Sequence, residues 1–178
     1  MSMTLIEHYE VPAGSGLTSV TLNSIPQTYT DLLVLVSSRA GTGGGGGLDL
    51  YITFNGSSSG YSGRTLLGTG STVASQTPGS SSIKLGQWIN AATANTYGNA
   101  SIYLPNYAGS QDKAVSADLV AENNGTLSRQ FIAAGLWANS SGISSITFEA
   151  ELSYPIQQYS SFTIFGITAG SDGTTVVS

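Results

Sequence analysis

The sequence predicts an all-β protein, an antiparallel β-sandwich of jelly-roll type with about 8 to 10 strands. Short segments of alternating apolar and polar residues recur along the chain, and clusters of Gly, Pro, Asn and Ser separate them. No stretch has the period of an amphipathic helix. The 178 residues fit one domain spanning 1–178, with a polar tail from about residue 169.

The first three segments are expected to be strands of increasing burial. Residues 3–11 scatter apolar side chains among polar ones, as an edge strand does, and residues 17–22 place Val20 and Leu22 on one face. Residues 29–39 are apolar on both faces and rich in valine, which predicts a central strand buried on both sides. A short buried helix is the alternative, and the β-branched residues argue against it.

Loops interrupt the middle of the chain. The glycine-rich residues 41–47 predict a flexible loop, because glycines lose much backbone entropy in any regular element. Residues 48–55 alternate, with Asp49 outward and an inward set of Leu48, Leu50, Ile52 and Phe54. Residues 56–82 are expected to be mostly loop, opening with Asn55-Gly56 and containing one short strand at 64–67. Another short strand is expected at 83–90.

Five more strands are expected in the second half. Residues 97–104 and 160–168 alternate, and residues 144–152 place Ile146, Phe148, Ala150 and Leu152 inward. Residues 131–137 are apolar on both faces and form the second candidate for a central strand. Residues 113–122 fit a strand or a helix, and a strand is favoured because strands flank them on both sides.

Composition excludes several classes of function. Charged residues make up 8% of the chain, the net charge is -5, and the five Lys and Arg residues are scattered, so nucleic-acid binding is not expected. The absence of cysteine excludes disulfides and thiolate metal sites. With no signal-peptide pattern and no apolar run of membrane-spanning length, the protein is expected to be made in the cytoplasm and to bind no membrane.

The catalytic motifs in the chain lack the context that their chemistry needs. His8, the only histidine, lies on an expected edge strand with no nucleophile specified nearby. The Gly-x-Ser-x-Gly match at 56–60 has no histidine after it. The dinucleotide fingerprint at 41–46 and the Ser-x-x-Lys match at 81–84 lack the helices that they require. Neither an enzyme activity nor a cofactor is therefore expected.

The acidic residues show no calcium-loop spacing, and no metal site is expected. Glu149 and Glu151 would lie about 7 Å apart on one strand face, a separation that could suit a glycosidase. A solvated strand face is favoured, because their neighbours Ser145 and Thr147 are ordinary surface residues. Four sequons, which begin at Asn55, Asn99, Asn124 and Asn139, are expected to lie in polar loops and on strand faces.

Aromatic side chains in loops are the remaining candidates for a binding site. The chain has nine tyrosines and two tryptophans, and tyrosine supplies contact area at little cost in rotamer entropy. Tyr61, Trp88 and Tyr107 could therefore stack on a sugar or be buried at a protein interface. Ordinary packing beneath the loops is the alternative for each of them.

Six short segments, taken in order, resemble a family of small structural proteins of tailed bacteriophages, especially those infecting cyanobacteria and marine bacteria. The segments are Ile25–Leu32, Tyr51–Gly56, Ala94–Asn99, Ile102–Tyr107, Ala134–Trp137 and Phe165–Ile167. The similarity spans about residues 9–167, and it lies in the order of the segments because no single motif is specific. The glycine-rich loop at 41–47 departs from the family pattern.

This resemblance implies a β-sandwich on the exterior of the virion. As a capsid decoration (cement) protein, it would bind the major capsid protein, commonly as a homotrimer at a threefold position, and stabilise the shell without catalysis. The alternative is a tail-fibre or receptor-binding module that recognises host surface carbohydrate. A third possibility, a glycan-cleaving enzyme, needs a clustered acid pair.

Overall fold

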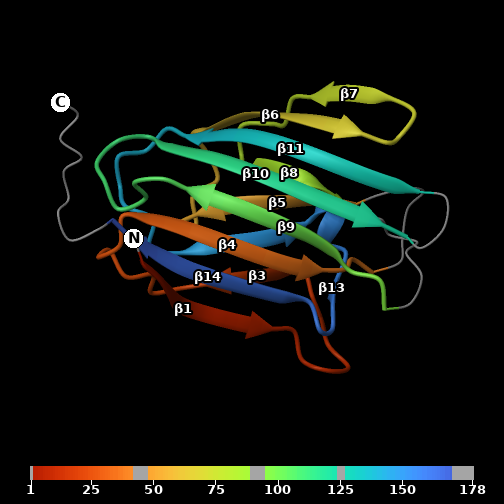
Figure 1. Ribbon diagram of the computed structural model, residues 1–178, viewed down its shortest axis with the longest axis horizontal. Helices are drawn as coiled ribbons and strands as arrows, with labels where there is room; N and C mark the ends of the chain where they lie inside the picture. The colour runs from red at the N-terminus through yellow and green to blue at the C-terminus, as the bar shows by residue number, and fades with distance from the viewer. Residues whose placement is uncertain (1, 42–47, 89–94, 124–126, 170–178) are drawn as a thin grey trace.

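A computed structural model of the protein describes residues 2–41, 48–88, 95–123 and 127–169, which form two antiparallel sheets packed face to face (Figure 1). The predicted antiparallel β-sandwich is therefore confirmed. The large sheet has eight strands, which in spatial order are β1 (Ser2–Glu10), β14 (Ser161–Thr168), β4 (Asp31–Ser38), β9 (Gly98–Leu104), β10 (Lys113–Glu122), β11 (Ser128–Trp137), β6 (Tyr61–Gly68) and β7 (Val73–Gln76).

The small sheet lies behind the large one in the view of Figure 1. Its four strands, in spatial order, are β3 (Ser19–Leu22), β12 (Ile146–Ala150), β5 (Leu48–Phe54) and β8 (Ile83–Trp88). A pair of two-residue strands, β2 (Gly16–Leu17) and β13 (Ile156–Gln157), forms a third sheet. One 3-10 turn, η1 (Glu151–Ser153), follows β12.

Eight of the strands have the topology of a jelly roll. Counted along the chain, these eight are β1, β3, β4, β5, β8, β9, β12 and β14. In the large sheet the first, eighth, third and sixth of them are neighbours, and in the small sheet the second, seventh, fourth and fifth. The jelly-roll prediction is thus confirmed. Two hairpins, β6–β7 and β10–β11, extend the large sheet beyond β9 and explain most of the strands beyond the predicted number.

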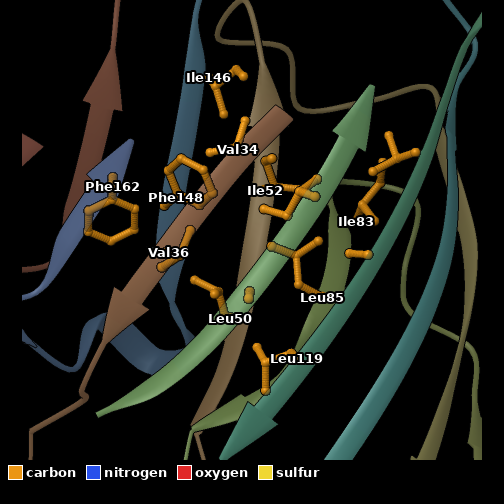
Figure 2. Close-up of a cluster of buried hydrophobic side chains, with 14 of the residues drawn as sticks. Val34, Val36, Leu50, Ile52, Ile83, Leu85, Leu119, Ile146, Phe148 and Phe162 are labelled. Carbon is orange, nitrogen blue, oxygen red and sulfur yellow. The ribbon is translucent and has the colours of Figure 1, made fainter. Parts of the chain in front are cut away.

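Apolar side chains from both sheets fill the space between them. Figure 2 shows side chains of β4, β10 and β14 lying against those of β5, β8 and β12. Val34 of β4 and Ile52 of β5 are fully buried, and the rings of Phe148 and Phe162 lie 4.8 Å apart across the interface. The buried residues form one continuous cluster, so the two sheets share a single core.

Alternation of apolar residues predicted the inward faces correctly. Residues 113–122 form the strand β10, and their burial alternates at every position, which excludes the helical alternative. Val20 and Leu22 are buried in β3 as expected, although residues 17–22 are divided between β2 and β3. The nine-residue strand β1 is an edge strand, as predicted for residues 3–11.

The two strands expected to be buried on both faces are buried on one. In β4 the side chain of Val34 is buried while Leu35 is 42% exposed, and in β11 Ile132 is 58% exposed. The prediction was wrong because the small sheet covers only one face of the large sheet. No described element covers the opposite face, which we call the outer face.

Three smaller predictions were also wrong. Leu152 is 79% exposed, because β12 ends at Ala150 and Leu152 adopts a left-handed conformation in η1, with φ of 54°. Asp49 was expected to point outward and is buried beside Lys84. Residues 56–82 contain the longer strand β6 and the unexpected strand β7.

The turn at Asn55-Gly56 opens a longer loop, as predicted. Both residues have positive φ, 51° and 66°, and the Ser57 N–H donates to the Phe54 carbonyl at 2.9 Å. Because β5 and β6 belong to different sheets, this turn redirects the chain and closes no hairpin. The predicted flexible loop at 41–47 and the polar tail from about residue 169 lie outside the described residues, apart from Gly41 and Ala169.

Candidate binding surface

The three aromatic candidates from the sequence are packed in the core. Tyr61, Trp88 and Tyr107 are 3%, 2% and 0% exposed, which is the ordinary packing alternative. Tyr61 and Trp88 lie in β6 and β8, so the loop position predicted for them was wrong. The ring of Tyr61 stacks on that of Trp137, with centroids 6.1 Å apart. None of the three rings can stack on a ligand at the surface of this structure.

Of the catalytic motifs that the sequence analysis rejected, His8 and the matches at 56–60 and 81–84 lie among the described residues, and the 41–46 match lies outside them apart from Gly41. His8 Nδ1 is hydrogen-bonded to Thr163 Oγ1 at 2.8 Å on the outer face, between β1 and β14. The 56–60 segment connects two strands, and no helix follows it in the described part of the chain. Among the described residues, no group of three or more His, Asp and Glu side chains could hold a metal ion. The described residues also contain no helix long and apolar enough to cross a membrane.

A buried ion pair joins β5 to β8. Lys84 Nζ lies 2.6 Å from Asp49 Oδ2, and both side chains are 9% exposed. The Tyr51 hydroxyl donates to the same Asp49 oxygen at 2.9 Å. Burial, and then the charge of Asp49, raises the pKa of Tyr51, so that Tyr51 stays a neutral donor. The sequence alone does not predict this pair, because it shows only that Asp49 and Lys84 lie in two segments that are each expected to be strands.

The two glutamates that could have formed a glycosidase pair are separated by the end of β12. Glu149 is exposed on β12, whereas Glu151 lies in η1 and accepts the backbone N–H of Asp49 at 3.2 Å. They do not share a strand face, so that expectation was wrong. The outer side of the small sheet is instead a shallow polar hollow lined by Ser, Thr and Glu side chains.

The outer face of the large sheet carries most of the exposed large apolar side chains. Cross-strand pairing places them on one face, because residues directly opposite in antiparallel strands point to the same side. One row runs across the sheet through Leu5, Phe165, Leu33 and Tyr103, and the next through Thr163, Leu35, Ser101, Asp118, Ile132 and Leu66. Met3, Val120 and Leu136 lie on the same face and are also exposed.

A hollow interrupts this face between β9 and β11. The residues that line it are Ser101, Tyr103, Ser116, Ala117, Asp118 and Ile132. The small side chains of Ser101 and Ser116 leave room between the Tyr103 ring and Ile132. A second shallow depression follows on the same face between β11 and β6, around Arg64, Ala134 and Leu136.

Tyr103 is held in place at the rim of the hollow. Its hydroxyl donates to Asp31 Oδ2 at 2.8 Å, and the other Asp31 oxygen accepts the backbone N–H of Asn106 at 2.8 Å. The hydrogen bond to Asp31 raises the pKa of Tyr103, which keeps the phenol protonated. The ring is 39% exposed and is one of the few aromatic side chains of the described residues that reach solvent.

Comparison with known proteins found no protein-family model, curated protein sequence or solved structure that matches this chain. The resemblance to phage structural proteins therefore stays a prediction. The jelly-roll topology follows from the strand order alone.

Proposed function

We propose that the protein is a non-enzymatic decoration protein of a bacteriophage capsid, and that the outer face of its large sheet binds the outer surface of the shell. The observation that carries this proposal is the gathering of exposed apolar side chains on one sheet face. Soluble proteins rarely expose a contiguous apolar patch unless it is a contact surface. Ile132, Leu66 and Leu35 occur in one row of this face and are each more than two fifths exposed.

The size of the face fits a protein partner. Eight strands about 4.8 Å apart, with a mean length of about 25 Å, give a surface of roughly 800 to 1,000 Å². A stable protein interface of standard size buries about 800 Å² on each partner. The shape is broad and shallow, which suits a shell surface better than it suits a small ligand in a deep pocket.

Charge and chemistry support a passive role. The chain has a net charge of -5 with few charged residues, and the Lys84–Asp49 ion pair is buried. A host-carbohydrate site is less favoured, since the aromatic side chains proposed for sugar stacking are buried. We expect a homotrimer at a threefold position of the shell, which sedimentation of the purified protein tests.

Binding to stripped particles tests the proposed function. Ile132→Glu places a charge on the outer face, whereas Leu152→Glu places the same charge on η1, at an exposed position outside that face. We expect the wild-type protein and Leu152→Glu to cosediment with particles stripped of the protein, and Ile132→Glu to lose most of this binding. Equal binding of both variants would overturn the assignment of the outer face, and no binding by the wild-type protein would overturn the function.

A further inference from the structure

We propose that the hollow between β9, β10 and β11 is a receptor for an arginine side chain of the partner protein, with Asp118 as the anion and Tyr103 as the stacking surface. This inference rests on the proposed function for the identity of the partner. The chemistry of the hollow follows from its own residues.

Strand pairing fixes the positions of the two binding groups. Tyr103 of β9 is directly opposite Ser116 of β10, and Asp118 is two residues farther along β10 on the same face. The Cα atoms of such diagonal neighbours lie about 7 to 8 Å apart, and both side chains line the hollow. Ser101, directly opposite Asp118, is too small to fill the space. The arrangement leaves a gap with an aromatic ring on one side and a carboxylate on the other.

The carboxylate of Asp118 is available to a ligand. Asp118 is exposed, and no hydrogen bond or ion pair joins its side chain to another described residue. The nearest cation on this face by strand register is Arg64, which lies two strands away opposite Ala134 and donates to Thr77 Oγ1. Asp31, behind Tyr103, adds a second negative charge near the hollow. The local charge therefore favours a cation.

The ring of Tyr103 is prepared for stacking. The hydrogen bond from its hydroxyl to Asp31 restricts the ring, so that little side-chain entropy remains to be lost when a ligand binds. A planar guanidinium can stack on an aromatic face while it donates two parallel hydrogen bonds to a carboxylate. An ammonium group is a compact point charge and cannot do both with the same geometry. These features favour arginine over lysine.

Titration of the isotope-labelled protein with N-acetyl-arginine methylamide, followed by NMR, tests the proposal. We expect saturable shifts at Tyr103, Asp118 and Ile132, and none at Glu149 on the small sheet. Asp118→Asn should raise the dissociation constant about threefold to fivefold, which is the effect expected for an exposed ion pair. Glu149→Gln is the matched control, because it removes the same charge from an exposed strand position on the opposite sheet, and it should leave the constant unchanged.

Two further variants test the shape of the hollow without changing its charge. Tyr103→Leu removes the stacking surface, and Ser116→Leu fills the floor; each should weaken binding at least as much as Asp118→Asn. Amide spectra of each variant establish that it is folded. The proposal is overturned if Glu149→Gln weakens binding as much as Asp118→Asn, if N-acetyl-norleucine methylamide binds as tightly, or if the lysine analogue binds more tightly.

The failure of this inference can be distinguished from failure of the proposed function. If the arginine amide binds in the hollow but stripped particles do not bind the protein, the receptor stands and the decoration function is wrong. If particles bind the wild-type protein and Asp118→Asn equally, and the amide does not bind, the decoration function stands and the receptor is wrong.

Discussion

Gly135 of β11 lies directly against Ile83 of β8: a Cβ on Gly135 would stand 2.7 Å from Ile83 Cγ2. Through this contact, the edge strand β8 of the small sheet packs against the β10–β11 hairpin of the large sheet. Gly86 of β8 makes a similar approach to Phe131, where a Cβ would stand 2.9 Å from the ring. The hairpin β10–β11 is therefore packed onto β8 as part of the core.

This contact leads to a first prediction. Gly135→Ala should destabilise the protein by about 1 to 3 kcal/mol, because the added methyl forces Ile83 out of a well-packed position. Gly79→Ala is the control, since nothing lies within 4 Å of a Cβ at that loop position, and it should change stability by less than about 1 kcal/mol. Urea unfolding measures both. Equal midpoints for the two variants would show that β8 and β11 are not in close contact.

Val34 and Leu35 test which face of β4 is covered. Val34→Asp should abolish soluble folding, because an unpaired carboxylate in the core costs several kcal/mol against a total stability of about 5 to 15 kcal/mol. Leu35→Asp, one residue along on the outer face, should fold with a melting temperature close to that of the wild type. Soluble expression and thermal melting followed by circular dichroism measure whether each variant folds. A folded Val34→Asp protein with an unchanged melting temperature would contradict the two-sheet core.

The ion pair between Lys84 and Asp49 gives a third prediction. Lys84→Met leaves Asp49 buried without its cation, and should cost about 3 to 5 kcal/mol. The double variant Lys84→Met with Asp49→Leu should recover most of this loss, because a buried pair replaced by apolar residues is often neutral or stabilising. Thermal unfolding of the single and double variants measures the difference. Additive losses would mean that the two side chains do not interact.

Stability should fall at alkaline pH. Burial raises the pKa of Tyr51, Tyr61 and Tyr107 above the ordinary value of 10.0. Above about pH 10 the unfolded chain therefore releases protons that the folded protein retains, and the free energy of unfolding decreases as pH rises. Urea midpoints at about pH 9 and pH 11 test this, and Tyr51→Phe should lose less stability over that interval. Burial lowers the pKa of Lys113, whose contribution runs in the opposite direction; a net rise in stability with pH would show that Lys113 dominates.

Measurements on particles depleted of the protein distinguish a capsid decoration protein from a receptor-binding module. For a decoration protein that binds assembled shell, mass action predicts that complete particles resist heat and chelation better than depleted ones. DNA release should therefore begin at a lower temperature in depleted particles, while adsorption of the intact ones is unchanged. Normal DNA retention with lost adsorption would overturn the decoration function and favour a receptor-binding module. Both quantities are measured on the same preparation.

Alternation predicted the inward faces of the jelly roll because the two sides of most strands meet different surroundings. Ile52 of β5 and Phe148 of β12 were placed correctly from the sequence alone. Leu35 and Ile132 were placed wrongly, because an apolar side chain on an exposed sheet face produces the same sequence pattern as one in a core. For the same reason the sequence did not predict the apolar outer face, and it suggested as binding residues three aromatic side chains that belong to the core.

Polar residues were harder to predict, since their burial depends on partners distant in the chain. Asp49 followed the alternation that places it outward, and the cation that compensates its burial is Lys84, thirty-five positions away. The hollow between β9, β10 and β11 depends on the register of these strands, and Tyr103 and Asp118 have no recognisable spacing in sequence. Short β7, with the residues Val-Ala-Ser-Gln, has too little pattern to be detected.

The position of β14 has a consequence for how the protein is made. This last strand lies between β1 and β4, with Ser2 opposite Thr168, so two strands near the start of the chain become connected only through one near its end. Until the ribosome has released residues 161–168, β1 has no neighbour and β4 has one open edge. The pairing of β1 and β4 with β14 therefore cannot form until residues 161–168 have left the ribosome, and both strands keep an open edge until then.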